Sequence, residues 1–347
     1  MTTTPPSCDI FCVVVDNYGD AGVCWRLARQ LATEYGWRVR LWVDNPAPLE
    51  QLAPDYVTGP VEVLRWPSPW RPVDCADVVI EAFACEPPAP YVETMATRSR
   101  PPVWLNLEYL SAESWVAGCH GLPSPHPRLP LVKHFFFPGF AADTGGLLRE
   151  RDYETRRKAF DTAAFRTEFG LPAKSPDELT ISLFSYENPA LPVLMRAWSD
   201  SDRPIRVLRP GNGEATSTIG NLSLHPLPFL PQRRYDELLW ACDLNFVRGE
   251  DSFVRAQWAA KPFVWQIYPQ ADDAHRTKLD AFLAIHPAGP LLADFWHAWN
   301  GMGTPDWPGF ASGMPGLGEP MQHWANTLAA RPNLASRLVQ FCLERLK

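Results

Sequence analysis

The N-terminal part of the chain alternates apolar runs with a polar turn. Ile10–Val15 is a continuous apolar and β-branched run, the kind of strand that is buried on both faces of a parallel sheet. The following segment, Asp16-Asn17-Tyr18-Gly19-Asp20, has the composition of a turn, and apolar residues then recur at helical spacing from Val23 to Leu31. A second apolar run follows at Val39–Val43. The pattern predicts a strand, a helix and a second strand, which is a βαβ unit.

Similar apolar runs continue along the chain and divide it into two α/β halves. Roughly the first 110 residues have the pattern of a doubly wound domain, with further strands expected at Val61–Leu64, Val78–Phe83 and Val103–Leu107. The segment Ser111–Phe140 is richer in loops. The second half has expected strands and helices at Thr180–Phe184, Ile205–Leu208, Leu222–Leu224, Arg234–Ala241, Leu244–Val247, Phe253–Ala260, Phe263–Ile267 and Ala274–Ala284.

We therefore predict an α/β protein of two Rossmann-like domains. Its 347 residues are about twice the ~150 residues of a typical domain. We expect an N-terminal domain over residues 1–165, a C-terminal domain over 175–315, and final helices over 316–347 that pack back on the first domain. The charged segment Arg149–Lys158, with the polar stretch Pro172–Pro176 beyond it, is the candidate linker; a solvated helix surface explains the same charges.

Composition excludes several classes of function. Lys and Arg number 32 against 39 Asp and Glu, a net charge of −7, which argues against generic nucleic-acid binding. No apolar stretch approaches the ~20 residues of a membrane span, and the first residues do not resemble a secretory leader, so we expect a cytoplasmic protein without membrane contact. The 8 Cys form no CxxC pair and are expected to be reduced thiols rather than zinc ligands.

Common catalytic fingerprints are missing from the sequence. It contains no GxGxxG after a strand, no GxxxxGK[ST], no HExxH and no GxSxG. A nicotinamide dehydrogenase, a P-loop enzyme, a zinc protease and an α/β-hydrolase therefore lose their usual support. Candidate chemistry must come from the turns at the carboxyl ends of the strands, where open α/β sheets bind ligands.

The acidic turn after the first strand is one such candidate. Asp16 and Asp20 bracket Gly19, and two carboxylates held toward a ligand can abstract a proton or bind a cationic substrate. The alternative is structural: Asp16 caps the turn and Asp20 is the N-cap of the next helix.

The turn Arg248-Gly249-Glu250-Asp251-Ser252 suits a diphosphate. Gly249 permits close backbone approach, the next helix supplies free N–H groups, the Ser252 hydroxyl can donate, and Arg248 can offset phosphate charge. Glu250 and Asp251 would repel a diphosphate unless their backbone amides face it or their side chains serve another group. The alternative is a capping Asp251 or Ser252 with Arg248 in an ion pair.

Aromatic and amide side chains at other expected strand ends can bind a base. Tyr186 follows the strand Thr180–Phe184, and Phe229 and Gln232 lie in the segment after Leu222–Leu224. An aromatic face together with an amide can sandwich and read a base. The alternative is ordinary packing, which is the more frequent role of each of these residues when it is taken singly.

Taken together, these motifs resemble a known family. The chain is similar to the elongation factor P arginine rhamnosyltransferases, the EarP family, nearly from end to end. The resemblance rests on motifs in the same order: Val15 to Val23 with Trp25-Arg26-Leu27-Ala28-Arg29, Leu107-Glu108-Tyr109-Leu110-Ser111-Ala112-Glu113, Gly145-Gly146-Leu147-Leu148-Arg149-Glu150-Arg151-Asp152, and Arg248 to Gln257.

The resemblance implies a fold, a reaction and site residues. It implies a GT-B glycosyltransferase, with two Rossmann-like domains facing across a cleft, that transfers rhamnose from dTDP-β-L-rhamnose to an arginine of elongation factor P with inversion. No cofactor beyond the donor substrate and no metal is expected. Asp16, Asp20 and Glu250 are then the implied catalytic carboxylates. The implied nucleotide-binding residues are Tyr186, Phe229, Gln232, Arg248, Gly249, Asp251 and Ser252.

The acidic residues fit this chemistry. A guanidinium has a pKa above ~12 and delocalised lone pairs, so it is a poor nucleophile until carboxylates bind and polarise it. We expect Asp20 to be the general base, Asp16 to orient the guanidinium or support Asp20, and Glu250 to position the sugar or the arginine. Two rivals remain: a GT-B enzyme with another acceptor, such as lipopolysaccharide core, and a non-catalytic nucleotide-sugar sensor.

Overall fold

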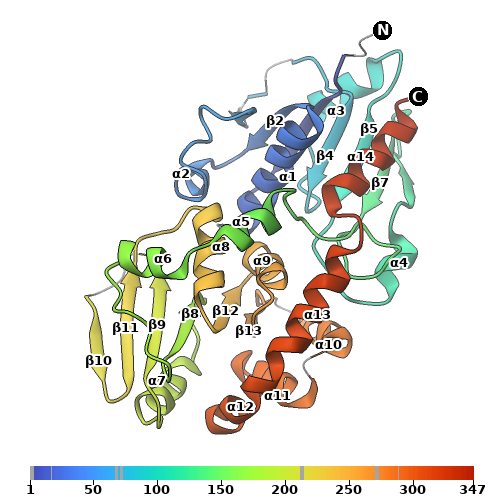
Figure 1. Ribbon diagram of the computed structural model, residues 1–347. Coiled ribbons are helices and arrows are strands. Elements are labelled where there is room, and N and C mark those ends of the chain that lie inside the picture. Colours follow the sequence, from blue (N-terminus) through green and yellow to red (C-terminus); the bar gives the residue numbers. More distant parts are fainter. Residues whose placement is uncertain are drawn as a thin grey trace. The chain divides into compact units, whose positions relative to one another are not determined.

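The computed structural model consists of two compact units, each built on a mostly parallel sheet (Figure 1). The structure describes residues 4–16, 18–66, 69–70, 73–211, 215–269, 273–287 and 289–347. Met1–Thr3 and Asn17, the second residue of the predicted acidic turn, lie outside the described residues. The first unit comprises Met1–Arg151 and Arg331–Lys347, and the second comprises Asp152–Ala330.

The first unit has the doubly wound order β3-β2-β1-β4-β5-β7-β6, in which only the short edge strand β6 is antiparallel. The order reverses beside β1, the position at which open α/β sheets bind ligands. Its elements are β1 (Ser7–Cys12), α1 (Gly19–Tyr35), β2 (Arg38–Val43), α2 (Ala47–Leu52), β3 (Val61–Arg65), β4 (Val78–Ala82), α3 (Ala89–Thr97), β5 (Val103–Leu107), α4 (Trp115–Cys119), β6 (Pro123–Pro125), β7 (Val132–Phe136) and α14 (Leu334–Arg345).

The second unit has the order β10-β11-β9-β8-β12-β13, again parallel except at one edge, where β10 pairs antiparallel with β11. Its elements are α5 (Tyr153–Ala159), α6 (Thr162–Glu168), β8 (Leu179–Leu183), α7 (Leu191–Ser199), β9 (Ile205–Pro210), β10 (Ser217–Ile219), β11 (Leu222–Leu227), α8 (Gln232–Ala241), β12 (Leu244–Arg248), α9 (Asp251–Ala259), β13 (Phe263–Gln266), α10 (Ala274–Ile285), α11 (Gly289–Trp299), α12 (Trp307–Gly313), the 3₁₀ helix η1 (Met314–Leu317) and α13 (Gly318–Ala329).

The boundary between the units differs from the predicted one at residues 165–175. The charged segment expected to be a linker forms α5, which belongs to the second unit. Tyr153 on this helix is buried, its hydroxyl accepts from Trp240 Nε1 at 2.8 Å, and Arg156 binds the buried Asp236 at 3.0 Å. Because these partners lie 80 or more positions along the chain, the local run of charges could not predict that this segment packs into the second unit.

The C-terminal helices divide between the units instead of forming one group. α13 belongs to the second unit, although residues 316–347 were all expected on the first domain. α14, red in Figure 1, belongs to the first unit and packs against α1. It buries Leu334, Ala335, Leu338, Val339 and Cys342, so the first unit is assembled from both ends of the chain.

The first strand is shorter than the apolar run predicts. β1 ends at Cys12, so Val13, Val14 and Val15 leave the sheet. The backbone N–H of Val14 donates to Asp44 Oδ1 at 2.9 Å, and that of Val15 donates to Asp20 Oδ2 at 2.9 Å. These carboxylates replace the hydrogen bonds of the sheet, which ends the strand despite its β-branched residues.

One of the resemblance motifs is structural. Arg26 on α1 binds Glu150 through Nε at 2.8 Å and Nη2 at 3.0 Å, and Gln30 donates to the carbonyl of Arg149 at 2.7 Å. Gly145 lies so close to β7 that an added Cβ would be 2.8 Å from Phe136 Cε1. The segment 145–150 is therefore fixed against the first sheet and its helix α1.

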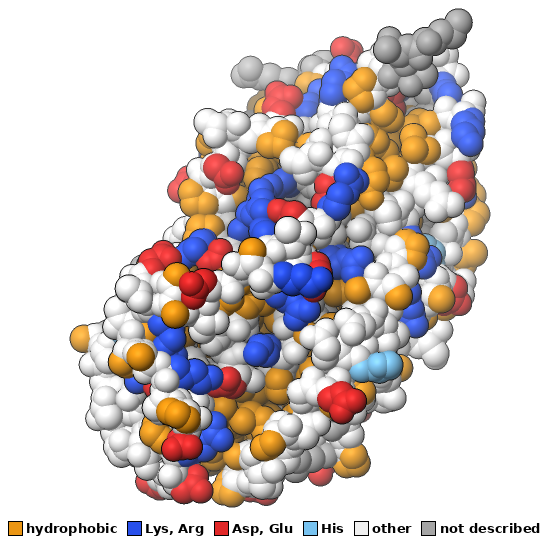
Figure 2. All heavy atoms as spheres, in the orientation of Figure 1, with side chains coloured by type: hydrophobic (Ala, Val, Ile, Leu, Met, Phe, Trp, Pro, Cys, Tyr) orange, Lys and Arg blue, Asp and Glu red, His pale blue; other side chains and the backbone are white. Residues whose placement is uncertain are grey.

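The surface carries side chains of both charges (Figure 2), and the cysteines are free thiols. In Figure 2, Lys and Arg side chains lie among Asp and Glu side chains over the face in view. All 8 cysteines are free, and Cys8, Cys12, Cys24, Cys242 and Cys342 are buried. Within the described ranges, no helix has the length and apolar character needed to cross a membrane.

Candidate active site

The acidic turn of the first unit holds Asp20 in a fixed orientation. α1 begins at Gly19, so Asp20 stands in its first turn, buried at 2% exposure, and Tyr18 rather than Asp20 is the N-cap. Asp20 Oδ2 accepts from the backbone N–H of Val15 at 2.9 Å and of Asp16 at 2.8 Å. Burial raises the pKa of the Asp20 carboxyl above its ordinary value of 3.8, although these amide bonds oppose the shift. A raised pKa makes the carboxylate a better proton acceptor.

Gly19 lets Asp16 pack onto the start of the same helix. The carbonyl of Asp16 accepts from the N–H of Gly19 at 2.6 Å and of Asp20 at 3.3 Å. A Cβ on Gly19 would lie 2.4 Å from Asp16 Oδ2. The structure therefore brings Asp16 and Asp20 together at the carboxyl end of β1, as the sequence predicts, and their catalytic roles stay predictions.

Sequence reasoning assigned no role to the aromatic pair beside this turn. Tyr109, two residues after β5, donates its hydroxyl to Asp20 Oδ1 at 3.3 Å. The ring of Phe83, the residue after β4, stacks on Tyr109 with centroids 4.2 Å apart and an interplanar angle of 11°. The sequence signal that could have found them is their position, because both residues lie within two positions of the end of a buried strand in the sheet that carries the acidic turn.

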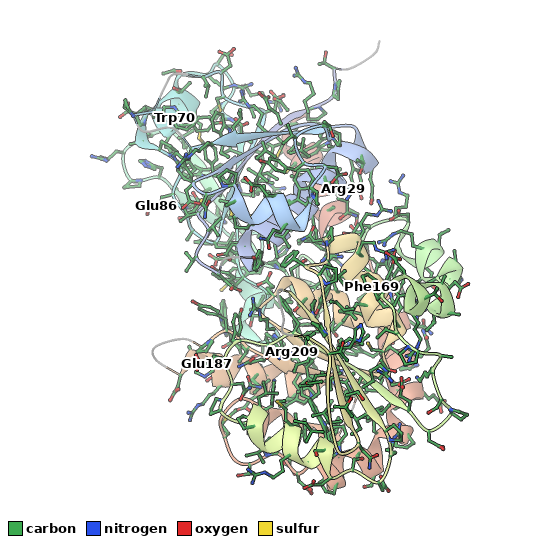
Figure 3. All side chains as sticks on the ribbon, turned by 90° about the vertical axis from the view of Figure 1, so that its left-hand side faces the viewer. Arg29, Trp70, Glu86, Phe169, Glu187 and Arg209 are labelled. Carbon is green, nitrogen blue, oxygen red and sulfur yellow. The ribbon has the colours of Figure 1, made fainter. Side chains whose placement is uncertain are left out.

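In the second unit, Arg248 at the end of β12 is held between aromatic rings. Its guanidinium carbon lies 4.2 Å from the centroid of Phe184 and 4.5 Å from that of Tyr186, and Nη1 donates to the carbonyl of Ser185 at 2.9 Å. The loop after β8 that carries Tyr186 also carries Glu187, which Figure 3 labels. The structure therefore joins the predicted residues Arg248 and Tyr186 at neighbouring strand ends.

The Asp251 carboxylate belongs to a buried polar network. Asp251 Oδ2 accepts from Gln232 Nε2 and from Arg255 Nε, both at 3.0 Å, and Arg255 Nη1 binds Asp236 Oδ1 at 2.8 Å. The sequence left open how an acidic residue could stand beside a diphosphate. Here the charge of Asp251 is offset by Arg255, which is also buried.

The Ser252 hydroxyl is engaged inside its own turn. It donates to the carbonyl of Arg248 and accepts from the N–H of the same residue at 2.9 Å. This geometry differs from the expected donation to a phosphate, because the hydroxyl proton already has a backbone acceptor. Gly249 has a φ of 59°, the left-handed region that glycine adopts readily, and this lets the chain turn from β12 into α9.

Glu250 and Phe229 both lie shortly before a helix begins. Glu250 is the half-buried N-cap of α9, and its carbonyl accepts from the N–H of Val254 at 2.9 Å. Phe229 is half-buried in the loop between β11 and α8, three positions before Gln232. Of the two predicted residues in this segment, Gln232 therefore hydrogen-bonds to Asp251, and Phe229 lies in the loop before α8.

The second unit thus combines features suited to a nucleotide diphosphate. The N-terminus of α9 carries the positive end of its helix dipole, which attracts an anion. Arg248 lies four residues before Ser252 with its guanidinium at the adjacent strand ends. Across the ranges that the structure describes, no group of three or more His, Cys, Asp or Glu side chains is arranged to hold a metal ion.

Comparison with known proteins identifies the family. The profile of the family described as "Elongation-Factor P (EF-P) rhamnosyltransferase EarP" matches residues 8–343. A protein-arginine rhamnosyltransferase of Pseudomonas aeruginosa is 48% identical over 96% of this chain and 98% of its own length. A solved structure that explains EarP-mediated arginine glycosylation of translation elongation factor EF-P is 34% identical, with a TM-score of 0.67, over 98% of this chain and 99% of that chain.

Distant similarity supports the fold. The glycosyltransferase SnogD of Streptomyces nogalater superposes with a TM-score of 0.52 at 11% identity, over 98% of this chain and all of its own. The fold class is therefore GT-B, as the sequence predicts, and the protein is a glycosyltransferase. With its two parallel-sheet units and a family match over nearly its whole length, the chain belongs to the EarP family of EF-P rhamnosyltransferases.

Proposed function

We propose that this protein transfers rhamnose from dTDP-β-L-rhamnose to an arginine side chain of elongation factor P, in the cytoplasm. The observation that carries the proposal is the Asp20 carboxylate, buried at the carboxyl end of β1 with one oxygen held by two backbone amides. Membership of the EarP family supports the sugar and the acceptor, because relatives are named protein-arginine rhamnosyltransferases.

Asp20 would act as the general base. The Oδ2 atom already accepts two amide hydrogen bonds, so Oδ1 is the oxygen that takes a proton from the acceptor. Burial raises the pKa of this carboxyl, which favours the transfer. Asp16, placed beside it across Gly19, would orient the guanidinium through a charge-assisted hydrogen bond. Together they polarise a nitrogen that is otherwise a poor nucleophile.

The transfer would be one displacement with inversion. The guanidinium nitrogen forms a bond to the anomeric carbon while the bond from that carbon to the diphosphate oxygen breaks, and Asp20 accepts the nitrogen's proton. The diphosphate leaves with the bonding electron pair, which Arg248 and the first-turn amides of α9 would stabilise. Glu250 would position the sugar or the arginine. We propose that no metal takes part.

Intact mass of elongation factor P after incubation with the enzyme and dTDP-β-L-rhamnose tests the proposal, with fragmentation to locate the adduct. We expect one deoxyhexose on one arginine, in the α configuration by NMR, and the same rate in EDTA. An unmodified factor, with the donor shown to bind, would favour another acceptor or a sensor. Absence of donor binding would contradict the donor assignment.

Asp20→Asn separates catalysis from donor binding. We expect transfer to fall at least ~100-fold, because the amide cannot accept the proton. Donor affinity, measured by calorimetry, should stay unchanged, because the proposed donor residues all lie in the second unit. Asp55→Asn is the matched control, since this exposed carboxylate lies elsewhere in the first unit. Lost donor binding in Asp20→Asn would contradict the assignment.

A further inference from the structure

The loop after β4 has an unusual backbone. Phe83, Ala84 and Glu86 have φ values of 57°, 55° and 48°, and none is glycine. Residues other than glycine rarely adopt this left-handed backbone conformation, and those that do are held in it by the surrounding structure. Figure 3 labels Glu86, which lies in this exposed part of the first unit.

The loop is fixed by hydrogen bonds to its neighbours. The N–H of Phe83 donates to the carbonyl of Leu107 at 2.7 Å, and that of Ala84 donates to Asn106 Oδ1 at 3.1 Å. Asn106 also donates to Glu108 Oε1 at 2.6 Å, and Cys85 Sγ donates to the carbonyl of Phe11. The loops after β4 and β5 are thereby held together, which places the Phe83 ring on Tyr109.

This arrangement directs the Tyr109 hydroxyl at the reacting carboxylate. The Tyr109 side chain remains 37% exposed, so burial does not explain its position. Its ring is stacked on Phe83 and its hydroxyl contacts Asp20 Oδ1, the oxygen that the two backbone amides leave for the acceptor. A carboxylate oxygen has two lone pairs, so it can accept from Tyr109 and from a guanidinium together.

We propose that Tyr109 is a positioning residue that holds the Oδ1 atom of Asp20 in the orientation required of the base, and that Phe83 holds Tyr109 in place by stacking. This inference rests on the proposed function of Asp20. Tyr109 keeps its proton throughout, so the transfer step itself is unchanged. The strained loop then has a role, because its left-handed residues are what present the Phe83 ring.

The hydroxyl also affects the protonation of Asp20. The titratable groups that act on or sense this carboxyl are Asp16 in the same turn, Cys24 four residues later on α1, and Tyr109 from the loop after β5. Asp16 raises the pKa of Asp20 by charge repulsion, whereas the hydrogen bond from Tyr109 lowers it. Removal of that hydroxyl should therefore raise the pKa.

Tyr109→Phe keeps the ring and removes only the hydroxyl. We expect kcat to fall about 5- to 20-fold with little change in KM for either substrate, and the acidic limb of the pH profile to move to higher pH. Phe83→Ala should shift the pH profile in the same direction although the Tyr109 hydroxyl is present, because the stacking ring is lost. Phe83→Tyr keeps an aromatic ring at this position and should have the wild-type pH profile. Tyr56→Phe, elsewhere in the first unit, is the matched control.

A direct measurement makes the test independent of turnover. The pKa of Asp20 can be followed by NMR of carboxyl-labelled aspartate, assigned with Asp20→Asn, and it should rise in Tyr109→Phe. An unchanged pKa together with an unchanged pH profile would overturn the inference. A shift in Tyr109→Phe but not in a folded Phe83→Ala would overturn the part assigned to Phe83. A wild-type protein that modifies no elongation factor P would instead refute the proposed function.

Discussion

A buried histidine makes the stability of the second unit depend on pH. His286, directly after α10, is 6% exposed and packs edge-on or tilted against four aromatic rings, those of Phe263, Phe282, Trp296 and Trp324. Among the residues that the structure describes, neither ring nitrogen has a hydrogen-bond partner. Burial lowers the pKa of His286 from 6.5 to about 3. The folded protein therefore holds this imidazole neutral over most of the acidic range.

The sign and size of the effect follow from the two pKa values. In the unfolded chain His286 takes up a proton below its ordinary pKa of 6.5, but in the folded chain it does so only near 3. The unfolded state binds more protons in between, so stability is complete above pH 6.5 and is lost progressively as the pH falls toward 3. At 1.36 kcal/mol per unit, the loss between about pH 8 and about pH 5 is about 2 kcal/mol.

Urea unfolding of the wild type and of His286→Phe, at about pH 8 and about pH 5, measures this contribution. The phenyl ring suits the aromatic site and does not titrate, so the variant should lose about 2 kcal/mol less than the wild type on acidification. The same substitution at His323, an exposed residue of α13, should leave the pH dependence unchanged. Equal losses in the wild type and His286→Phe would refute the reasoning.

Three further substitutions test the site. Gly19→Ala should lower kcat about tenfold, because the new Cβ displaces the Asp16 carboxylate. The melting temperature should hardly change. An unaltered transfer rate would show that Asp16 needs no fixed position. Arg248→Ala should weaken donor binding in calorimetry about 10- to 100-fold, and unchanged affinity would place the diphosphate elsewhere. Arg255→Leu removes the guanidinium that binds both Asp251 and Asp236, so each buried carboxylate loses a charged partner and urea unfolding should show a loss of about 3–5 kcal/mol; a loss below about 1 kcal/mol would contradict a buried network.

Most strands could be predicted from the sequence because each is a short, continuous apolar run. Val39–Val43 and Val103–Leu107, for example, form β2 and β5 with at most one residue of difference. β7, in the segment expected to be mostly loops, was missed because Lys133 and His134 interrupt its apolar character. Lys133 nevertheless binds the buried Glu81 at 2.5 Å, a partner on another strand that no local pattern contains.

The candidate site was predictable where it depends on a single turn. Asp16, Asp20 and the turn beginning at Arg248 were found because acidic or glycine-containing turns follow buried strands. The function of neighbouring side chains was not predictable in this way. The pairing of Asp251 with Arg255, and the stack of Phe83 on Tyr109, join residues whose contacts depend on how separate elements pack.

The return of the C-terminal helix to the first unit has a consequence for synthesis. A ribosome completes the sequence of the second unit, Asp152–Ala330, before it has made α14. Until α14 packs against α1 and buries Leu334, Leu338 and Cys342, the surface of the first unit that this helix covers remains open to water. The unit that carries Asp20 is therefore completed only after α14 has been made, whereas the sequence of the second unit is complete before that helix.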